Sequence, residues 1–269
     1  MNIQHKGIRV ISLGIGDGHK DAVILNKLCD MTKGTIDYWI IEFSYEMLKI
    51  GLKNVQEDIG ENINRINTKL FQTDFLDLGI LSDLMNDDKI NLFMLLGNTL
   101  GNFTEDVLLN KIDSVMKEGD FFLIDNQIKG ENKLNKAERR LLNEMYNTKK
   151  YKEYIFSILK NAQIYPGDGN INTRITDYNS QNAILRKFNC ATVTQEFAFS
   201  RKKEVEIGGR KLSFDETTII PVIYSRKYTK NALNALLNNY FNIIGTPYYL
   251  NNKYALILAQ KVKNKNNMR

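Results

Sequence analysis

The sequence predicts an α/β fold in which a mostly parallel sheet is covered by helices and interrupted by an inserted lobe. Three observations predict it. Short apolar runs alternate with helical stretches from Gly7 to Asn126, as in a parallel sheet. The alternation stops over residues 131–225. A further helical stretch and two strand-like runs then close the chain, as expected if it returns to complete the first sheet.

Five strands are predicted in the first part of the chain. Their runs are nearly all apolar, so both faces of each strand should be covered. The predicted strands are residues 8–13, 37–43, 69–74, 90–96 and 120–126. The clearest helix start is Thr104, an N-cap residue that is followed by Glu105 and Asp106 in the first turn. Gly119 lies just beyond the expected end of this helix.

The predicted domains follow from the interruption. A charged helical stretch opens the lobe, and strand-like runs at 191–199 and 217–224 follow the turn PGDGN. A helix around 231–240 and strands near 242–250 and 254–260 complete a core sheet of seven strands. We therefore expect a core of residues 1–130 and 226–262, an inserted α+β lobe of residues 131–225, and a basic tail of residues 263–269.

The composition is that of a globular protein. The 269 residues are 43% hydrophobic, which is enough for a full core. No apolar run approaches the roughly 18 residues of a membrane helix, and the first residues lack the pattern of a secretion signal. We expect a cytoplasmic protein without membrane contact. Cys29 and Cys190 have neither CxxC spacing nor nearby histidines, so we expect no metal site and no disulfide framework.

The net charge of +6 raises the question of nucleic-acid binding. Four of the positive residues lie in a tail that is expected to fray: Lys261, Lys263, Lys265 and Arg269. A second cluster in residues 129–160 includes Arg139, Arg140, Lys149, Lys150 and Lys152, but glutamates interrupt it. We favour a solvated helix face for this cluster and keep an RNA-binding surface as the alternative.

A glycine-rich turn directly after the first strand indicates a nucleotide site. Gly14, Gly16 and Gly18 follow the run IRVISL and precede a helix. Glycine has no side chain to keep a ligand from the backbone, and such a turn opens at the carboxyl edge of the sheet. Because His19 stands where the dinucleotide fingerprint needs its third glycine, the spacing is G-x-G-x-G.

The next two strand ends carry groups that suit adenosine. Glu42 ends the second strand, close to the position where an acidic side chain receives ribose hydroxyls. The third strand ends in Asp74, an acceptor for an adenine amino group, and Phe75, an aromatic face for the ring. Three strand ends with appropriate groups in order predict adenosine binding.

The fourth strand runs into a second glycine turn, LLGNTLGNF, in which Gly97 and Gly101 bracket Asn98 and Thr99. Such a turn suits contacts with the methionine end of a cofactor and with a substrate. Four motifs in this order, LGIGDGHKD, QTDFLDL, LLGNTLGNFT and YSRKYT, resemble the histidine N-alpha-methyltransferase family of ergothioneine biosynthesis. The resemblance covers about residues 8–260, and LGNTLGNF is its most specific element.

The resemblance implies a Rossmann-like class I methyltransferase sheet that binds S-adenosylmethionine, and an inserted lobe that binds an amine substrate. The implied cofactor residues are Gly14, Gly16, Gly18, Glu42, Asp74, Phe75, Gly97, Asn98 and Thr99. Asn102 and Ser225 would contact the substrate, and Ser225, Lys227 and Tyr228 match the family's S-x-K-Y stretch.

Two departures from the family bear on the substrate. The family glutamate that helps to recognise histidine falls on Ile223, an aliphatic residue that cannot accept a hydrogen bond from an imidazole. The N-terminal segment that covers the pocket in the family has no counterpart before the first strand. We therefore expect a divergent, shortened relative that methylates something other than free histidine, with the pocket open or covered by a second copy or a partner subunit.

Methyl transfer from a sulfonium needs alignment and exclusion of water more than covalent machinery. An amine acceptor must lose a proton, and the candidates to assist are Asp125, Tyr224 and Tyr228, with Asn126 as a substrate contact. Each also suits a plain structural role in a core or at a strand end. Three function classes remain: a small-molecule or amino-acid N-methyltransferase, an RNA or protein methyltransferase, and a non-catalytic cofactor-binding subunit.

Overall fold

The computed structural model describes residues 7–178, 180–251 and 253–263. The chain divides into two compact units, one formed by residues 1–128 and 233–269 and the other by residues 129–232. The boundaries expected from the sequence differ slightly, because the strand Ile219–Thr229 continues through residue 226. Within the described residues, no helix has the length and apolar character needed to cross a membrane.

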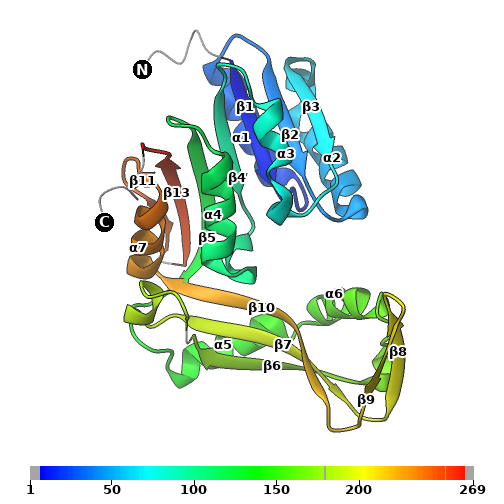
Figure 1. Ribbon diagram of the computed structural model, residues 1–269. Coiled ribbons are helices and arrows are strands. Elements are labelled where there is room, and N and C mark those ends of the chain that lie inside the picture. The colour runs from blue at the N-terminus through cyan, green and yellow to red at the C-terminus, as the bar shows by residue number, and fades with distance from the viewer. Residues whose placement is uncertain (1–6, 179, 252, 264–269) are drawn as a thin grey trace. The chain divides into compact units, whose positions relative to one another are not determined.

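The sheet of the first unit has the order β3-β2-β1-β4-β5-β13, in which the first five strands are parallel and β13 is antiparallel to β5 (Figure 1). This order is the Rossmann-like class I arrangement predicted from the sequence. The strands are β1 (Ile8–Leu13), β2 (Ile36–Ile41), β3 (Ile66–Phe71), β4 (Ile90–Leu95), β5 (Phe121–Lys129) and β13 (Tyr254–Gln260). The short strands β11 (Asn242–Ile243) and β12 (Tyr248–Leu250) both pair with β13, so the predicted strand near 242–250 is two pieces.

The helices of this unit are α1 (His19–Met31), α2 (Tyr45–Ile59), α3 (Ile80–Leu84), α4 (Glu105–Val115) and most of α7 (Lys230–Tyr240). Thr104 is the N-cap of α4, as predicted. The third strand was predicted wrongly: it spans Ile66–Phe71 and not residues 69–74. It is the edge strand, so its side chains alternate between half-buried and exposed and give a weaker apolar signal.

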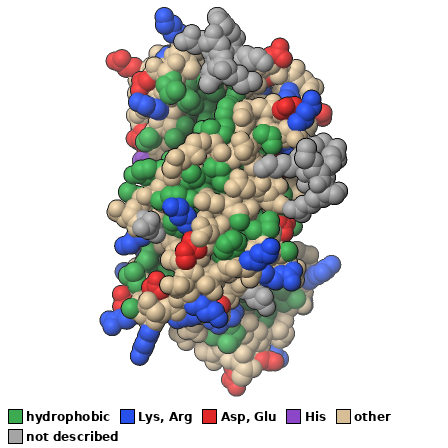
Figure 2. Space-filling view, turned by 90° about the vertical axis from the view of Figure 1, so that its left-hand side faces the viewer, with side chains coloured by type: hydrophobic (Ala, Val, Ile, Leu, Met, Phe, Trp, Pro, Cys, Tyr) green, Lys and Arg blue, Asp and Glu red, His purple; other side chains and the backbone are tan. Residues whose placement is uncertain are grey.

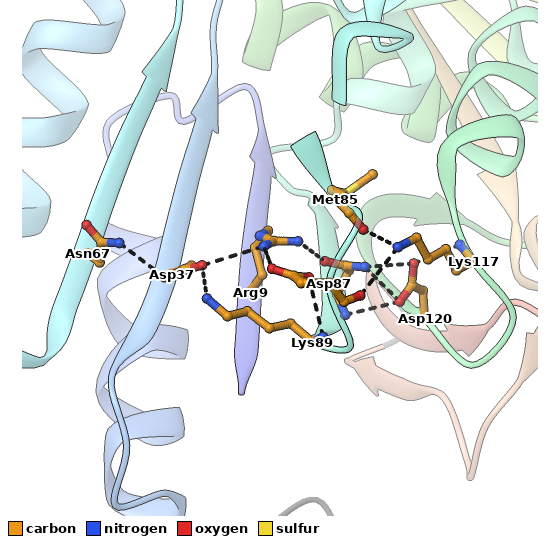
Figure 3. Close-up of polar contacts among 9 residues, drawn as sticks. Arg9, Asp37, Asn67, Met85, Asp87, Lys89, Lys117 and Asp120 are labelled. Carbon is orange, nitrogen blue, oxygen red and sulfur yellow. Dashed lines mark hydrogen bonds and ion pairs between the residues drawn. The ribbon is translucent and has the colours of Figure 1, made fainter. Parts of the chain in front are cut away.

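One rung of the parallel sheet is polar from β3 to β4 (Figure 3). Asn67, Asp37, Arg9 and Asn91 lie opposite one another on the four strands. Arg9 is 2% exposed, donates to Asn91 Oδ1 at 3.0 Å, and pairs with Asp87 and with Asp37 Oδ2 at 3.6 Å. Asn67 Nδ2 donates to Asp37 Oδ1 at 3.2 Å. A shift of any strand would leave charges buried without partners, so the rung sets the register.

A buried carboxyl lies at the contact between α1 and the sheet. Asp21 on α1 is 2% exposed, and the Tyr38 hydroxyl donates to its Oδ2 at 2.6 Å. Burial raises the pKa of Asp21 from 3.8 to about 6. The surrounding core is apolar and includes Val10, Leu25 and Ile40, so it solvates a charge poorly.

The second unit is an antiparallel sheet of order β10-β7-β6 with a separate hairpin. Its strands are β6 (Gly169–Asp177), β7 (Ala191–Phe199) and β10 (Ile219–Thr229), with β8 (Lys203–Ile207) and β9 (Arg210–Phe214) in the hairpin. The helices are α5 (Lys136–Tyr146), which starts in a capping box, and α6 (Lys149–Lys160). One apolar cluster joins α6 to Phe197 and Ile171, and another joins α5 to Ala191 and Val193.

The C-terminal end departs from expectation at Lys261. Its Nζ pairs with Asp113, and its backbone N–H donates to Asp120 O at 2.9 Å, so it does not fray. Lys263 Nζ lies 4.0 Å from Glu118. The other two positive residues of the tail, Lys265 and Arg269, lie outside the described residues.

We expect Arg9→Met to reduce the free energy of unfolding by roughly 1–3 kcal/mol, because it leaves the buried Asn91 Oδ1 without its donor and leaves Asp37 with Lys89 as its one remaining cation. Urea denaturation measures this loss. Lys53→Met is the control, since it removes only the exposed 3.6 Å pair with Glu57 and should cost less than about 0.5 kcal/mol. Equal effects of the two changes would contradict a role for the rung in holding the sheet.

We expect Asp21→Asn to remove a pH dependence of stability. The folded state holds the Asp21 proton up to about pH 6, whereas the unfolded chain releases it near 3.8. The stabilisation is therefore complete below pH 3.8 and is lost as the pH rises through 6, a change of roughly 3 kcal/mol. Denaturation between pH 4 and 8 should show a flatter profile for Asp21→Asn but not for the exposed control Asp30→Asn. Identical profiles for wild type and Asp21→Asn would count against this.

Candidate functional site

The carboxyl ends of the first three strands are joined by backbone hydrogen bonds. Gly14 N donates to Ile41 O at 2.8 Å, just past the ends of β1 and β2. Glu42 N donates to Phe71 O at 3.1 Å, which ties the end of β2 to the end of β3. The predicted cofactor residues Gly14 and Glu42 therefore lie along one edge of the sheet, where ligands of open α/β sheets bind, and Asp74 follows three residues after the end of β3.

The three glycines of the first turn have positive φ values of 83°, 56° and 81°, but the reasons for them differ. A Cβ on Gly16 would meet no atom within 4 Å, so the chain leaves open space there. A Cβ on Gly14 would lie 2.8 Å from Phe75 Cζ. A Cβ on Gly18 would lie 2.3 Å from Gly51 O on α2, so Gly18 is required for helix packing.

The adenosine candidates are held by local contacts. Glu42 is half-buried, and its Oε1 accepts from Ser44 N at 2.8 Å, while Ser44 caps α2. Phe75 begins the short 3-10 turn η3 (Phe75–Asp77) directly after Asp74 and is 9% exposed. Its ring lies 5.6 Å from that of Phe103. This ring pair brings the end of the second glycine turn next to the predicted adenine face.

The second glycine turn is held by hydrogen bonds of its own residues Asn98 and Thr99. Asn98 has a left-handed φ of 64°, and its Oδ1 accepts from Gln127 N at 2.9 Å. Its backbone N–H donates to Asp125 Oδ1 at 2.9 Å. Thr99 Oγ1 donates to Leu96 O at 2.7 Å, in the 3-10 turn η4 (Thr99–Asn102). The side chains of Asn98 and Thr99 thus shape the turn, and Asn102 at its end is exposed.

Lys20 is a residue that the sequence reasoning missed. It lies in the first turn of α1, and its Nζ pairs with Asp125 Oδ2 on β5. A cation at a helix N-terminus opposes the helix dipole and would have signalled a nearby anion. Both oxygens of Asp125 are engaged, one by Lys20 and one by Asn98 N–H. These contacts give Asp125 a bracing role, and its part as a base stays a prediction.

Asn126 differs from its neighbour. It is fully buried, and neither its Oδ1 nor its Nδ2 has a hydrogen-bond partner. Because side chains alternate along β5, it lies on the opposite face from Asp125. A buried amide without hydrogen-bond partners reduces stability by about 1–3 kcal/mol. The presence of such an amide at position 126 therefore supports a contact with a ligand or a water molecule.

The other candidates belong to the second unit. Tyr224 on β10 is 38% exposed and lies 4.7 Å from the Arg226 guanidinium, while Tyr228 is fully buried. Ser225 Oγ accepts from Lys227 Nζ at 3.0 Å. Burial lowers the pKa of Lys227 to about 7. Since these residues and the cofactor candidates are in different units, a joint site of Ser225, Tyr224 and Tyr228 with them stays a prediction.

Part of the basic cluster of residues 129–160 is paired with acids. Arg139 pairs with Asp177 at 2.9 Å, Arg140 with Glu144 at 2.8 Å, and Lys149 with Glu153 at 3.9 Å. Figure 2 shows Lys and Arg side chains interspersed with Asp and Glu over the face in view. This pairing is typical of a solvated helix face. In the described parts of the chain, no three His, Cys, Asp or Glu side chains gather in a way that suits a metal ion.

The chain has distant structural relatives. It is 13% identical to a SAM-dependent methyltransferase from Methanosarcina mazei, with 98% of this chain and 96% of that chain covered and a TM-score of 0.45. It is 9% identical to a SAM-dependent methyltransferase from Aquifex aeolicus, with 97% of this chain and 86% of that chain covered and a TM-score of 0.44. It is 9% identical to 1,6-didemethyltoxoflavin-N1-methyltransferase from Burkholderia thailandensis, solved with bound 1,6-didemethyltoxoflavin and S-adenosylhomocysteine, with 96% of this chain and 72% of that chain covered and a TM-score of 0.44. No curated protein matches the chain.

The sequence pattern described as "Histidine-specific methyltransferase, SAM-dependent" matches residues 1–261, nearly the whole chain. This match agrees with the family resemblance seen in the four motifs. The chain therefore belongs to the histidine-specific methyltransferase family, is an S-adenosylmethionine-dependent methyltransferase, and uses S-adenosylmethionine as its cofactor.

Proposed function

We propose that the protein N-methylates an amino group of a small molecule or amino acid other than free histidine. The environment of Ile223 supports a substrate other than free histidine. This side chain is half-buried and packs against the apolar cluster that contains Phe197 and Ile155. An aliphatic group in an apolar cluster offers no acceptor to an imidazole N–H.

The residues at the carboxyl edge suit the proposed cofactor contacts. The open space at Gly16 admits a ligand close to the backbone, Glu42 suits the ribose hydroxyls, and Asp74 with Phe75 suits the adenine. The Lys20 ammonium, which pairs with Asp125, is suited to bind the carboxylate of the methionine moiety in place of Asp125. When bound, the cofactor supplies a methyl group on a positively charged sulfur.

The amine must be neutral to attack, and the positive sulfur itself favours the neutral form. Asn126 is well suited to orient the acceptor, because its buried amide has both a donor and an acceptor to offer. Tyr224 and Tyr228 remain proton-transfer candidates. The acid-paired basic cluster gives an RNA methyltransferase less support, and a second copy or a partner that covers the pocket remains part of the proposal.

We expect wild-type protein to bind S-adenosylmethionine and S-adenosylhomocysteine in calorimetric titration, and not NAD. Asp74→Ala should weaken this binding by roughly 10- to 100-fold, the value of a hydrogen bond to a charged group. Gly16→Arg should abolish it by filling the open space, and Lys20→Met should weaken it while leaving adenosine binding unchanged. Asp77→Ala, an exposed change in the same turn, is the control. Unchanged affinity in Asp74→Ala and Gly16→Arg would mean that the cofactor site is misplaced.

We expect free histidine to bind the S-adenosylhomocysteine complex more weakly than about 1 mM, since Ile223 provides no acceptor. Ile223→Glu should tighten histidine binding by about tenfold or more, the value of one charged hydrogen bond. Ile219→Glu places the same charge at an exposed position of β10 and should change nothing. Micromolar binding of histidine to the wild type would contradict the proposal.

A further inference from the structure

The second unit buries polar side chains that the cofactor contacts do not explain. Gln195 on β7 is 1% exposed, and Ser225 and Lys227 on β10 are 4% and 1% exposed. Along β7, Gln195 lies between Phe197, a member of one apolar cluster, and Val193, a member of the other. A polar patch therefore interrupts an otherwise apolar sheet face.

The strand register places these side chains together. Gln195 is opposite Ile223, and Val193 is opposite Ser225, so Gln195 and Ser225 are diagonal neighbours on one face. Lys227 lies two residues further along the same face and reaches back to Ser225. The register of β10 against β7 shifts between Pro221 and Ile223, which puts a bulge next to Gln195. Bulges of this kind are common beside binding sites, where they re-aim side chains.

The amide of Gln195 is half satisfied. Its Nε2 donates to Thr173 Oγ1 at 2.9 Å. Its Oε1 is buried and has no partner. A buried acceptor without a donor carries a desolvation penalty. Gln195 Oε1 is therefore suited to accept a hydrogen bond from an N–H group of a ligand, since no described residue donates to it.

Lys227 presents the complementary case. Its Nζ contacts Ser225 Oγ at 3.0 Å and lies 5.2 Å from the centre of the Tyr146 ring. No carboxylate in the described part of the chain pairs with it. A buried ammonium in contact with only a hydroxyl and a ring can still donate to a ligand oxygen.

We propose that Gln195, Ser225 and Lys227 form a site for a primary amide group of the methyl acceptor. The amide N–H of the ligand donates to Gln195 Oε1, and the amide oxygen of the ligand accepts from Lys227 Nζ or Ser225 Oγ. A carboxylate of the same shape would place a negative oxygen against Gln195 Oε1, and an apolar group would satisfy neither partner. This site rests on the proposed function, because it concerns the substrate of the same reaction.

The test is calorimetric binding of three side chains of similar length to the protein saturated with S-adenosylhomocysteine. The probes are l-glutamine, l-glutamate and l-methionine. We expect glutamine to bind tightest and Gln195→Met and Lys227→Met each to weaken it by about tenfold or more, as for a lost buried hydrogen bond. Gln195→Met should bind S-adenosylhomocysteine as the wild type does and should melt at no lower temperature, which separates a binding role from a structural one.

Gln56→Met, the same change on the exposed surface of α2, is the matched control and should leave glutamine affinity unchanged. Equal or tighter binding of glutamate or methionine, absence of glutamine binding, or wild-type affinity in Gln195→Met would overturn the amide site. Methyl transfer to the twenty common amino acids, measured in parallel, separates the two proposals. Transfer to none of them, or transfer that does not depend on Gln195, overturns the amide site alone, whereas transfer to histidine and to no other amino acid overturns the proposed function as well.

Discussion

The polar rung through Arg9 is the constraint on which the cofactor edge depends. Parallel strands carry side chains with a period of two, and a slip by one residue would turn the apolar faces of β1 and β2 toward the wrong layer. Arg9 accepts only one alignment, because Asp37 and Asn91 must lie on either side of it (Figure 3). The same alignment brings Gly14 level with the end of β2, where Ile41 O receives its N–H. The amino ends of the strands thus determine which residues meet at the carboxyl ends.

At the carboxyl edge of the sheet, some residues hold the fold together and others leave room for a ligand, even where they are of the same type. Gly18 is required for the approach of α1 to α2, whereas Gly16 faces open space. Asn98 and Thr99 support a turn, and Asp125 connects that turn to Lys20 across the edge. An edge braced in this way holds its backbone in place before a ligand arrives. Less ordering is then needed on binding, which is the general advantage of a preorganised site.

The core sheet and its glycine turns were predictable because their signals are local. Buried strands such as β1 and β2 are mostly apolar runs, and the glycines of the first turn follow β1 directly. The edge strand β3 was misplaced because none of its side chains is fully buried and its sequence mixes polar and apolar residues. The strands β6, β8 and β9 were not predicted, because many of their side chains are polar or exposed and they form no continuous apolar run. Lys20 was missed because its partner Asp125 lies 105 residues away, and no local pattern reports such a contact.

The two units compensate their buried polar groups to different degrees. In the first, Arg9 and Asp120 are surrounded by opposite charges or amides, so the cost of burial is largely offset within the fold, whereas the amide of Asn126 has no partner. In the second, Gln195 Oε1 has no donor and Lys227 has no carboxylate among the described residues. Uncompensated groups of this kind lower stability and would be replaced by apolar residues if packing were their only role. The uncompensated Gln195 and Lys227 therefore place the expected substrate specificity mainly in the second unit, and Asn126 is the corresponding candidate in the first.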